Sequence, residues 1–116
     1  MEPIPYYYDN INRSALVVKP KQPFIDWLVS IESENKNVEE DLEGDVYLLP
    51  DFEEISQMKI WLKKNYDAIF SDQLNNWYTD ATCWPQHRTF EKFAGWFDYS
   101  LHTMILDTEE TKIEKL

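Results

Sequence analysis

The sequence predicts an α+β fold in which a small three-stranded sheet is packed by helices, in two layers and in the order β-α-β-α-(α)-α-β. Three observations predict it. Short apolar runs alternate with longer segments in which apolar residues recur every three or four positions. Only 2 glycines occur, which argues against a barrel or sandwich built on tight turns. The 116 residues suffice for one domain, 1–116, with a core of its own.

The chain is strongly acidic, with a net charge of -11 from 22 acidic and 11 basic residues. A field of this sign disfavours binding to nucleic acids and to anionic membranes, which attract basic proteins. It favours a basic protein partner or a cationic ligand, or it serves solubility alone. Cys83 is the only cysteine, so no internal disulfide can form. No signal peptide or membrane span is recognisable, and we therefore expect a cytoplasmic protein.

The two ends of the chain differ in composition from the part between them. Residues 1–13 contain Pro3, Pro5 and three consecutive tyrosines, which is typical of an extended arm that lies on the domain or on a second subunit. Residues 108–116 form a charged C-terminal tail, which we expect to fray.

The first predicted strand and helix follow the arm. Residues 14–19 form a short run that is apolar on both faces, and Pro20 ends it. Pro23 suits the first turn of a helix, because its missing N–H would be unpaired there. The helix is predicted to reach Ile31. Its apolar face comprises Phe24, Trp27, Leu28 and Ile31.

An acidic link separates this helix from the second predicted strand. Residues 32–44 are polar and rich in glutamate, which is typical of a solvated loop, although an acidic docking surface has the same composition. Residues 46–49 form the second strand, which Pro50 ends. Asp51 is the predicted cap of the next helix, with Glu54 as its capping-box partner.

The longest helical pattern lies within residues 51–79. An unbroken helix over this segment would span about 42 Å, which exceeds the diameter of about 35 Å expected for a domain of this length. We therefore expect a break near Asn65 or at Ser71-Asp72.

The last predicted helix is aromatic. Thr89 is its N-cap, and Gly95 within it suggests the close approach of another backbone. Its apolar face comprises Phe90, Phe93, Trp96 and Phe97. Residues 102–107 form the third strand, whose place in the sheet the sequence leaves open.

The strand–helix–strand order at the start of the chain favours a parallel first pair joined by a right-handed crossover. If helices cover only one face of the sheet, its other apolar face needs a partner. The expected partners are a second copy, which would give a homodimer, or another protein.

Three motifs resemble a family of short bacterial proteins of unassigned function. Residues 12–27 match the pattern N-R-x-A-L-[VI]-x-K-P-K-x-P-F-x-x-W, and residues 48–50 match a strand that ends in Leu-x-Pro. Residues 77–85 match W-Y-x-x-x-x-x-W-P, which precedes a last aromatic helix. The resemblance covers most of residues 12–107 and implies a bacterial, cytoplasmic protein. It supplies no catalytic residues.

Residues 77–97 hold most of the side chains that could form a catalytic site. A small enzyme with an activated cysteine would use Asp80, Cys83, His87 and Arg88. A lone cysteine in aromatic and acidic surroundings is, however, more typical of a small apolar residue. The chain has no zinc-type ligand spacing and no glycine-rich phosphate loop, so we expect no metal and no cofactor.

Protein interaction is the favoured interpretation of the same segment, because Trp and Arg dominate binding hot spots. The candidate interaction residues are Trp77, Asp80, Trp84, His87 and Arg88. The structural alternative is that Arg88 locks the loop to Asp80 or to a neighbouring tryptophan.

Arg13, Lys19 and Lys21 are the candidate anion-binding residues, since ligands bind at strand ends in α/β sheets. Salt bridges to the many carboxylates of the chain are their alternative use.

We therefore expect a non-catalytic, acidic protein-interaction module of a bacterial cytoplasm. The first alternative is a small enzyme whose site lies in the loop 80–88. The second is an inhibitor or immunity-type protein whose acidic surface covers a basic partner.

Overall fold

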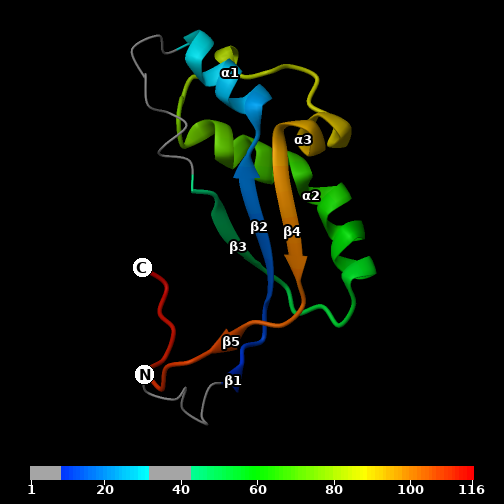
Figure 1. Cartoon of the computed structure of the whole chain (residues 1–116), viewed down its shortest axis with the longest axis vertical. Coiled ribbons are helices and arrows are strands. Elements are labelled where there is room, and N and C mark those ends of the chain that lie inside the picture. Colours follow the sequence, from blue (N-terminus) through cyan, green and yellow to red (C-terminus); the bar gives the residue numbers. More distant parts are fainter. Residues whose placement is uncertain (1–8, 32–42) are drawn as a thin grey trace.

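The structure is a computed structural model that describes residues 9–31 and 43–116. In this part of the chain it contains a three-stranded antiparallel sheet in the order β3–β2–β4, three α-helices and a ribbon of two short strands (Figure 1). The elements are β1 (Asp9–Asn10), β2 (Ser14–Pro20), α1 (Gln22–Ile31), β3 (Asp45–Leu49), α2 (Ile55–Asn75), the 3-10 helix η2 (Ala81–Cys83), α3 (Phe90–Trp96), β4 (Phe97–His102) and β5 (Leu106–Asp107). The predicted α+β class, with a small sheet packed by helices, is confirmed. The predictions for residues 1–8 and 32–42 lie outside the described residues.

β2 is the central strand and pairs antiparallel with both of its neighbours. The predicted parallel pairing of the first two strands is therefore wrong. Only Lys21 separates β2 from α1, and α1 lies beyond the end of β2 rather than across the sheet (Figure 1). The chain consequently enters β3 from this same end and runs back beside β2.

The last strand of the sheet begins earlier than predicted, because β4 follows α3 directly. The prediction of one strand over 102–107 is wrong, since β4 ends at His102 and only the two residues of β5, paired with β1, are extended after it. Phe97, which we predicted on the face of the last helix, instead starts β4. An alternation of period two explains this outcome: Phe97, Tyr99 and Leu101 point toward the helices, and the residues between them point away.

α2 is one continuous helix of 21 residues, so the predicted break near Asn65 or at Ser71-Asp72 is wrong. The helix begins later and ends earlier than the apolar pattern, and it spans about 32 Å. Its ribbon also bends along its length (Figure 1), as long helices that wrap a core do. The size limit is therefore met without interrupting the helix.

One predicted helix cap is present and the other is displaced. Thr89 caps α3 as predicted, and its Oγ1 accepts a hydrogen bond from the backbone N–H of Lys92 at 3.1 Å. The cap of α2 is Glu54 rather than Asp51, and the backbone N–H of Glu54 donates to Oε1 of Gln57 at 3.1 Å. The capping box thus lies one turn later than predicted.

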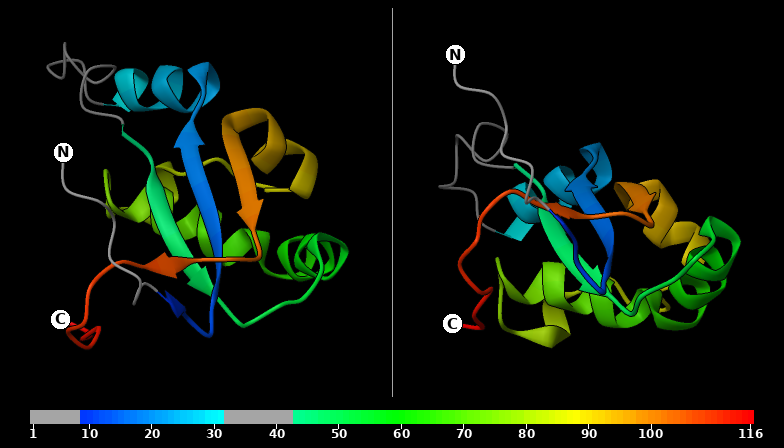
Figure 2. Two further views of the ribbon diagram at one scale, coloured as in Figure 1. Left: turned by 60° about the horizontal axis from the view of Figure 1, so that its bottom comes forward. Right: turned by 90° about the horizontal axis from the view of Figure 1, so that it is seen from below.

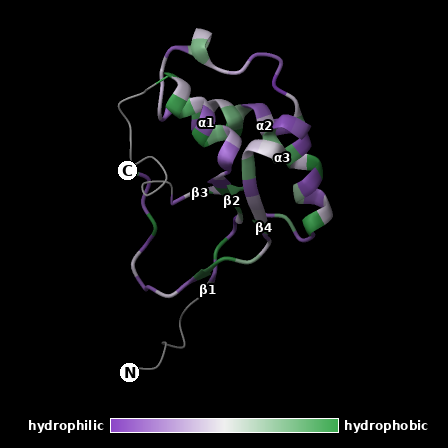
Figure 3. Ribbon diagram, turned by 45° about the horizontal axis from the view of Figure 1, so that its top comes forward, coloured by the Kyte–Doolittle hydropathy of each residue, from purple (hydrophilic) through white to green (hydrophobic). Residues whose placement is uncertain are grey.

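The core is built on aromatic rings between the sheet and the helices. The ring centroid of Phe70 lies 6.0 Å from that of Phe93, 5.6 Å from that of Trp96 and 5.4 Å from that of Phe97. The helices alternate polar and apolar residues along their ribbons (Figure 3), as helices that cover a core do. The buried core side chains include Leu16, Val18, Phe24, Leu28, Met58, Leu62, Phe70, Leu74, Phe93 and Phe97.

The described helices lie on one face and at one end of the sheet (Figure 2). They leave the opposite face uncovered. With one face uncovered, we expect a partner on the apolar part of that face.

The two glycines of the chain have opposite surroundings. Gly44 has a φ of 90°, and a Cβ at this position would lie 2.9 Å from the carbonyl oxygen of Val18. Gly95 lies inside α3, and apart from its chain neighbours and the backbone of its own helix no atom would come within 4 Å of a Cβ there. The prediction that another backbone approaches Gly95 is therefore wrong.

Alanine at these two positions should change stability in opposite directions. We expect Gly95→Ala to raise the free energy of unfolding by about 0.5–1 kcal/mol, because glycine is unfavourable inside a helix. Gly44→Ala should lower it by about 1–3 kcal/mol through backbone strain and the contact with Val18. Urea denaturation followed by circular dichroism measures both changes. Equal shifts in the two variants would contradict this account.

Candidate functional site

The loop 79–89, which carries the predicted interaction residues, is held closely against the chain by Arg88. The Nε of Arg88 lies 2.7 Å from Oδ1 of Asp67. Its Nη1 donates to the carbonyl oxygen of Pro85 at 3.1 Å, and its guanidinium carbon lies 5.8 Å from the ring centroid of Trp84. Arg88 thus locks the loop, with Asp67 of α2 as its acidic partner in place of the Asp80 considered from the sequence.

Three further hydrogen bonds fix the same loop. Trp84 donates its ring N–H to the carbonyl oxygen of Tyr78 at 2.7 Å. Trp27 of α1 donates to the carbonyl oxygen of Cys83 at 2.9 Å, and Tyr66 of α2 donates to that of Arg88 at 3.1 Å. The aromatic side chains therefore serve the loop's own structure, and Trp77 likewise packs against the core.

The four residues of the alternative enzyme site are only partly brought together. Sγ of Cys83 lies 4.0 Å from a carboxylate oxygen of Asp80. Hydrogen bonds from the hydroxyl and backbone N–H of Thr82 lower the pKa of Asp80, which caps η2. His87 is exposed with a φ of 55°. In residues 9–31 and 43–116, no group of three His, Cys, Asp or Glu side chains could hold a metal ion.

The three candidate anion-binding residues do not form a cluster. Arg13 precedes β2, whereas Lys19 and Lys21 lie at its far end, about 20 Å away in an extended strand. Lys21 donates to the carbonyl oxygen of Ala94 at 3.1 Å and forms an ion pair with Asp98 at 3.6 Å. Lys21 therefore forms a salt bridge, which is the alternative use that the sequence suggested for these basic residues.

A polar network beneath β3 was not predicted from the sequence. The hydroxyl of Tyr47 donates to Asp72 at 2.5 Å. Nε2 of Gln73, a residue that is only 2% exposed, donates to Asp45 at 2.7 Å and to the Tyr47 oxygen at 2.8 Å. Burial, followed by the hydrogen bond to Asp72, raises the pKa of Tyr47. The network ties β3 to the second half of α2, and no local spacing signals it because its partners lie 25–28 residues apart.

A cavity of about 290 Å³ opens beside this network. Its lining comprises Pro20, Glu43, Gly44, Asp45, Gln73, Asn76 and Trp77. The cavity therefore combines two carboxylates and a tryptophan at the end of the sheet where β3 begins.

β3 exposes apolar side chains on the face of the sheet that the helices do not cover. Val46 and Leu48 are 64% and 50% exposed, and they lie opposite Val17 and Ala15 of β2. Tyr47 between them points to α2, since side chains alternate along a strand. Ala15 is buried and Val17 is half-buried, so the exposed apolar surface at this border comes from Val46 and Leu48. We call this uncovered side of β2, β3 and β4 the open face.

The β4 side of the same face is polar. Asp98, Ser100 and His102 alternate with the residues that point to the helices. Lys19 of β2 lies opposite Asp98, and the side chains of Ser100 and His102 are 2.8 Å apart. The apolar part of the open face therefore lies on β3 and its border with β2.

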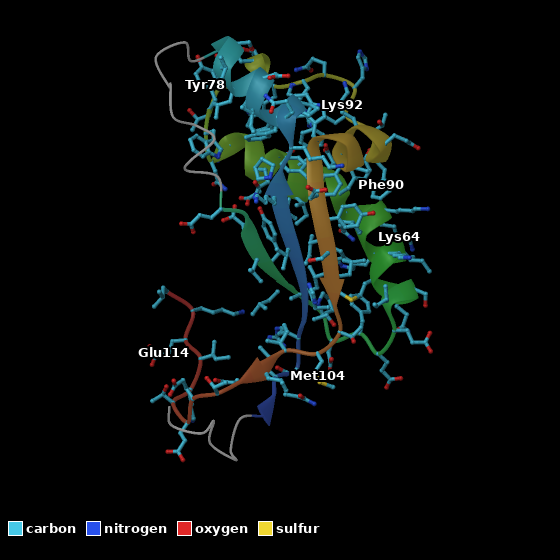
Figure 4. All side chains as sticks on the ribbon, in the orientation of Figure 1. Lys64, Tyr78, Phe90, Lys92, Met104 and Glu114 are labelled. Atoms are coloured by element: carbon cyan, nitrogen blue, oxygen red, sulfur yellow. The ribbon has the colours of Figure 1, made fainter. Side chains whose placement is uncertain are left out.

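A groove of about 650 Å³ separates Leu48 and Arg13 from the C-terminal tail. Figure 4 shows Glu114 on this tail, at the side of the sheet where β3 lies. The groove wall contributed by the tail also includes Ile113, which is exposed. The space beside the open face is thus bordered but not filled by the tail.

Compared with known protein families, curated proteins and solved structures, the chain matches none. None of the helices in the described ranges is long and apolar enough to span a bilayer. The candidate site is therefore defined only by the geometry of this chain.

Tyr47→Phe should make stability less sensitive to alkaline pH. The folded state holds the phenol proton more tightly than the unfolded chain, whose tyrosine pKa is about 10. The contribution of Tyr47 is therefore complete below pH 10 and declines as the pH rises above it. At neutral pH the variant should lose about 1 kcal/mol, and this deficit should shrink above pH 10. Urea denaturation from pH 7 to 11 measures it, with Tyr99→Phe as control; parallel profiles of wild type and Tyr47→Phe would contradict the assignment.

Arg88→Ala should loosen the loop 79–89. We expect faster amide hydrogen exchange over residues 84–89 and a loss of about 1–2 kcal/mol in the free energy of unfolding, because a charge-assisted hydrogen bond and a bond to a carbonyl disappear. Arg88→Lys should be intermediate, since it keeps the charge but not the planar fork. Lys64→Ala, on the exposed side of α2, is the control. Unchanged exchange in Arg88→Ala would show that the loop is held by other contacts.

Proposed function

We propose that this chain is a non-catalytic, acidic protein-interaction module that binds its partner on the open face of the sheet. One observation carries the proposal: Val46 and Leu48 stand exposed on a regular strand whose opposite side is packed on the core. Contiguous apolar surface of this kind marks interaction sites more often than it marks ordinary surface.

The energetics of the surface support this function. Covering each of the two exposed side chains contributes roughly 1 kcal/mol. The strand beneath them is held in place by the bonds of Asp45 and Tyr47 to α2, so little conformational freedom remains to be lost on binding. A rigid apolar strand is therefore a better docking element than an exposed loop of the same composition.

The charge of the chain supports a basic partner. With a net charge of -11, long-range attraction speeds the encounter with a basic protein and slows the encounter with an acidic one. This agrees with an inhibitor or immunity-type role, in which the module covers a basic protein. The resemblance of residues 12–107 to a family of short bacterial proteins supports a role in a bacterial cytoplasm.

The loop 79–89 supports a binding function less strongly than the open face. Trp84 and Arg88 are already engaged within the chain, and a partner would have to break those contacts. The loop gives the alternative enzyme little support, because the carboxylate of Asp80 accepts a hydrogen bond from Thr82 and the guanidinium of Arg88 is paired with Asp67.

Site-specific photo-crosslinking tests the proposed function. The photoreactive residue p-benzoylphenylalanine replaces Val46, or, as a matched control, Ile60, which is 59% exposed on the outer side of α2. In cells of the native host we expect a discrete crosslinked species from position 46 and none from position 60. Circular dichroism verifies that both variants fold. Equal crosslinking at the two positions, or none at 46, would contradict the proposal.

A further inference from the structure

We infer that the outer edge of β3 takes up an extended segment of a basic partner protein as a fourth strand of the sheet. The inference rests on the proposed function, because it names the chemistry and the shape of the partner at the strand edge that borders the open face. Three features support the inference. They are the edge position of β3, the acidic residues on both sides of it, and the repulsion that two copies of the chain would experience at this edge.

The first observation is the pairing of β3. Among the described strands only β2 pairs with it, so β3 is an edge of the sheet. Proteins commonly block such edges with a charged residue, a proline or a bulge. Residues 46–49, Val-Tyr-Leu-Leu, contain none of these blocking residues, and each has a regular register partner on β2. The backbone of this segment is thus suited to accept another strand.

The second observation is the charge on both sides of that apolar centre. Residues 43–54 carry five acidic side chains and no basic one. The acidic residues are Glu43, Asp45, Asp51, Glu53 and Glu54. An added strand with an apolar centre and basic residues at both ends would match this pattern along its whole length.

The cavity at the beginning of β3 offers a binding site for the basic residues at one end of the added strand. Glu43 and Trp77 both line this space of about 290 Å³, together with Asp45. A lysine or arginine side chain that enters there would meet two carboxylates and a tryptophan, which attracts cations to its face. The groove at the Leu48 end is less selective, since its lining holds four acidic and three basic side chains.

The same acidic residues disfavour a second copy of the chain as the added strand. In an antiparallel pair of two β3 strands centred on Tyr47, Glu43 of each copy would lie opposite Asp51 of the other. Like charges directly opposite one another are destabilising, and symmetry would produce this contact twice. The edge therefore selects a segment of opposite charge rather than itself.

A pair of synthetic peptides tests the inference on the full chain. One peptide has the sequence Lys-Lys-Val-Thr-Val-Thr-Val-Lys-Lys, and the control carries Glu in place of every Lys. We expect the basic peptide to bind at least tenfold more tightly by fluorescence anisotropy. Its binding should slow amide hydrogen exchange in β3 and weaken as salt is raised.

Charge reversal provides the matched variants. Glu43→Lys with Asp51→Lys should weaken the basic peptide at least tenfold and shift preference toward the acidic one. Asp26→Lys with Glu91→Lys changes the net charge equally, at exposed acidic residues of α1 and α3 that line neither the cavity nor the groove, and should leave the tenfold preference in place. If both double variants lose binding equally, only net charge matters and the inference is overturned.

Two further outcomes would overturn the inference. One is equal binding of the two peptides, or binding that leaves exchange in β3 unchanged. The other is a dimer by light scattering, twice the 14.0 kDa of the chain, whose β3 amides are protected without peptide. If position 46 crosslinks a native partner while the basic peptide fails to bind, the interaction function stands and only the fourth-strand inference fails.

Discussion

Aromatic packing around Phe70 is the constraint on which the rest of the structure depends. Phe70 belongs to α2, Phe93 and Trp96 to α3, and Phe97 to β4, so one set of ring contacts joins two helices to the sheet. Tilted and edge-on ring pairs at these separations add to the gain from burial. Because these rings lie on the helix side of the sheet, the core is one-sided, and the opposite face contributes little to holding the fold together.

The polar network beneath β3 compensates for the few apolar contacts that a one-sided core offers this strand. An edge strand with one uncovered face has few apolar contacts to hold it, and Leu49 is the only buried side chain of β3. Hydrogen bonds from Tyr47 and Gln73 supply directional attachment where apolar contact is scarce. Such bonds add little net stability on average, but they fix register, because a shift of the strand would leave buried polar groups unpaired.

Local sequence patterns predicted local structure well. They failed where contacts between residues distant in the sequence determine the structure. The strand at 14–19, the helix that reaches Ile31 and the Thr89 cap each depend on neighbouring residues, and each is present. Phe97 satisfies both a helical spacing with Phe93 and an alternation with Tyr99, and only its packing on β2 decides between them. The partner of Arg88 lies 21 residues away, so sequence spacing could not single it out. The exposure of the open face also depends on contacts between distant segments. The sequence therefore predicted an uncovered face only for the case in which the helices cover one side of the sheet.

The antiparallel pairing of β2 with β4 has a consequence for how the chain folds during synthesis. Ala15 lies opposite His102, so the central strand acquires its second partner only after roughly nine-tenths of the chain has been made. Pairings between such distant segments slow folding, because the entropy of closing the intervening loop is lost before the contacts form. Until β4 emerges from the ribosome, Leu16 and Val18 lack one wall of their core. The nascent chain therefore keeps its most apolar strand incompletely covered until most of the chain has been made, and the repulsion between its acidic residues opposes aggregation during that time.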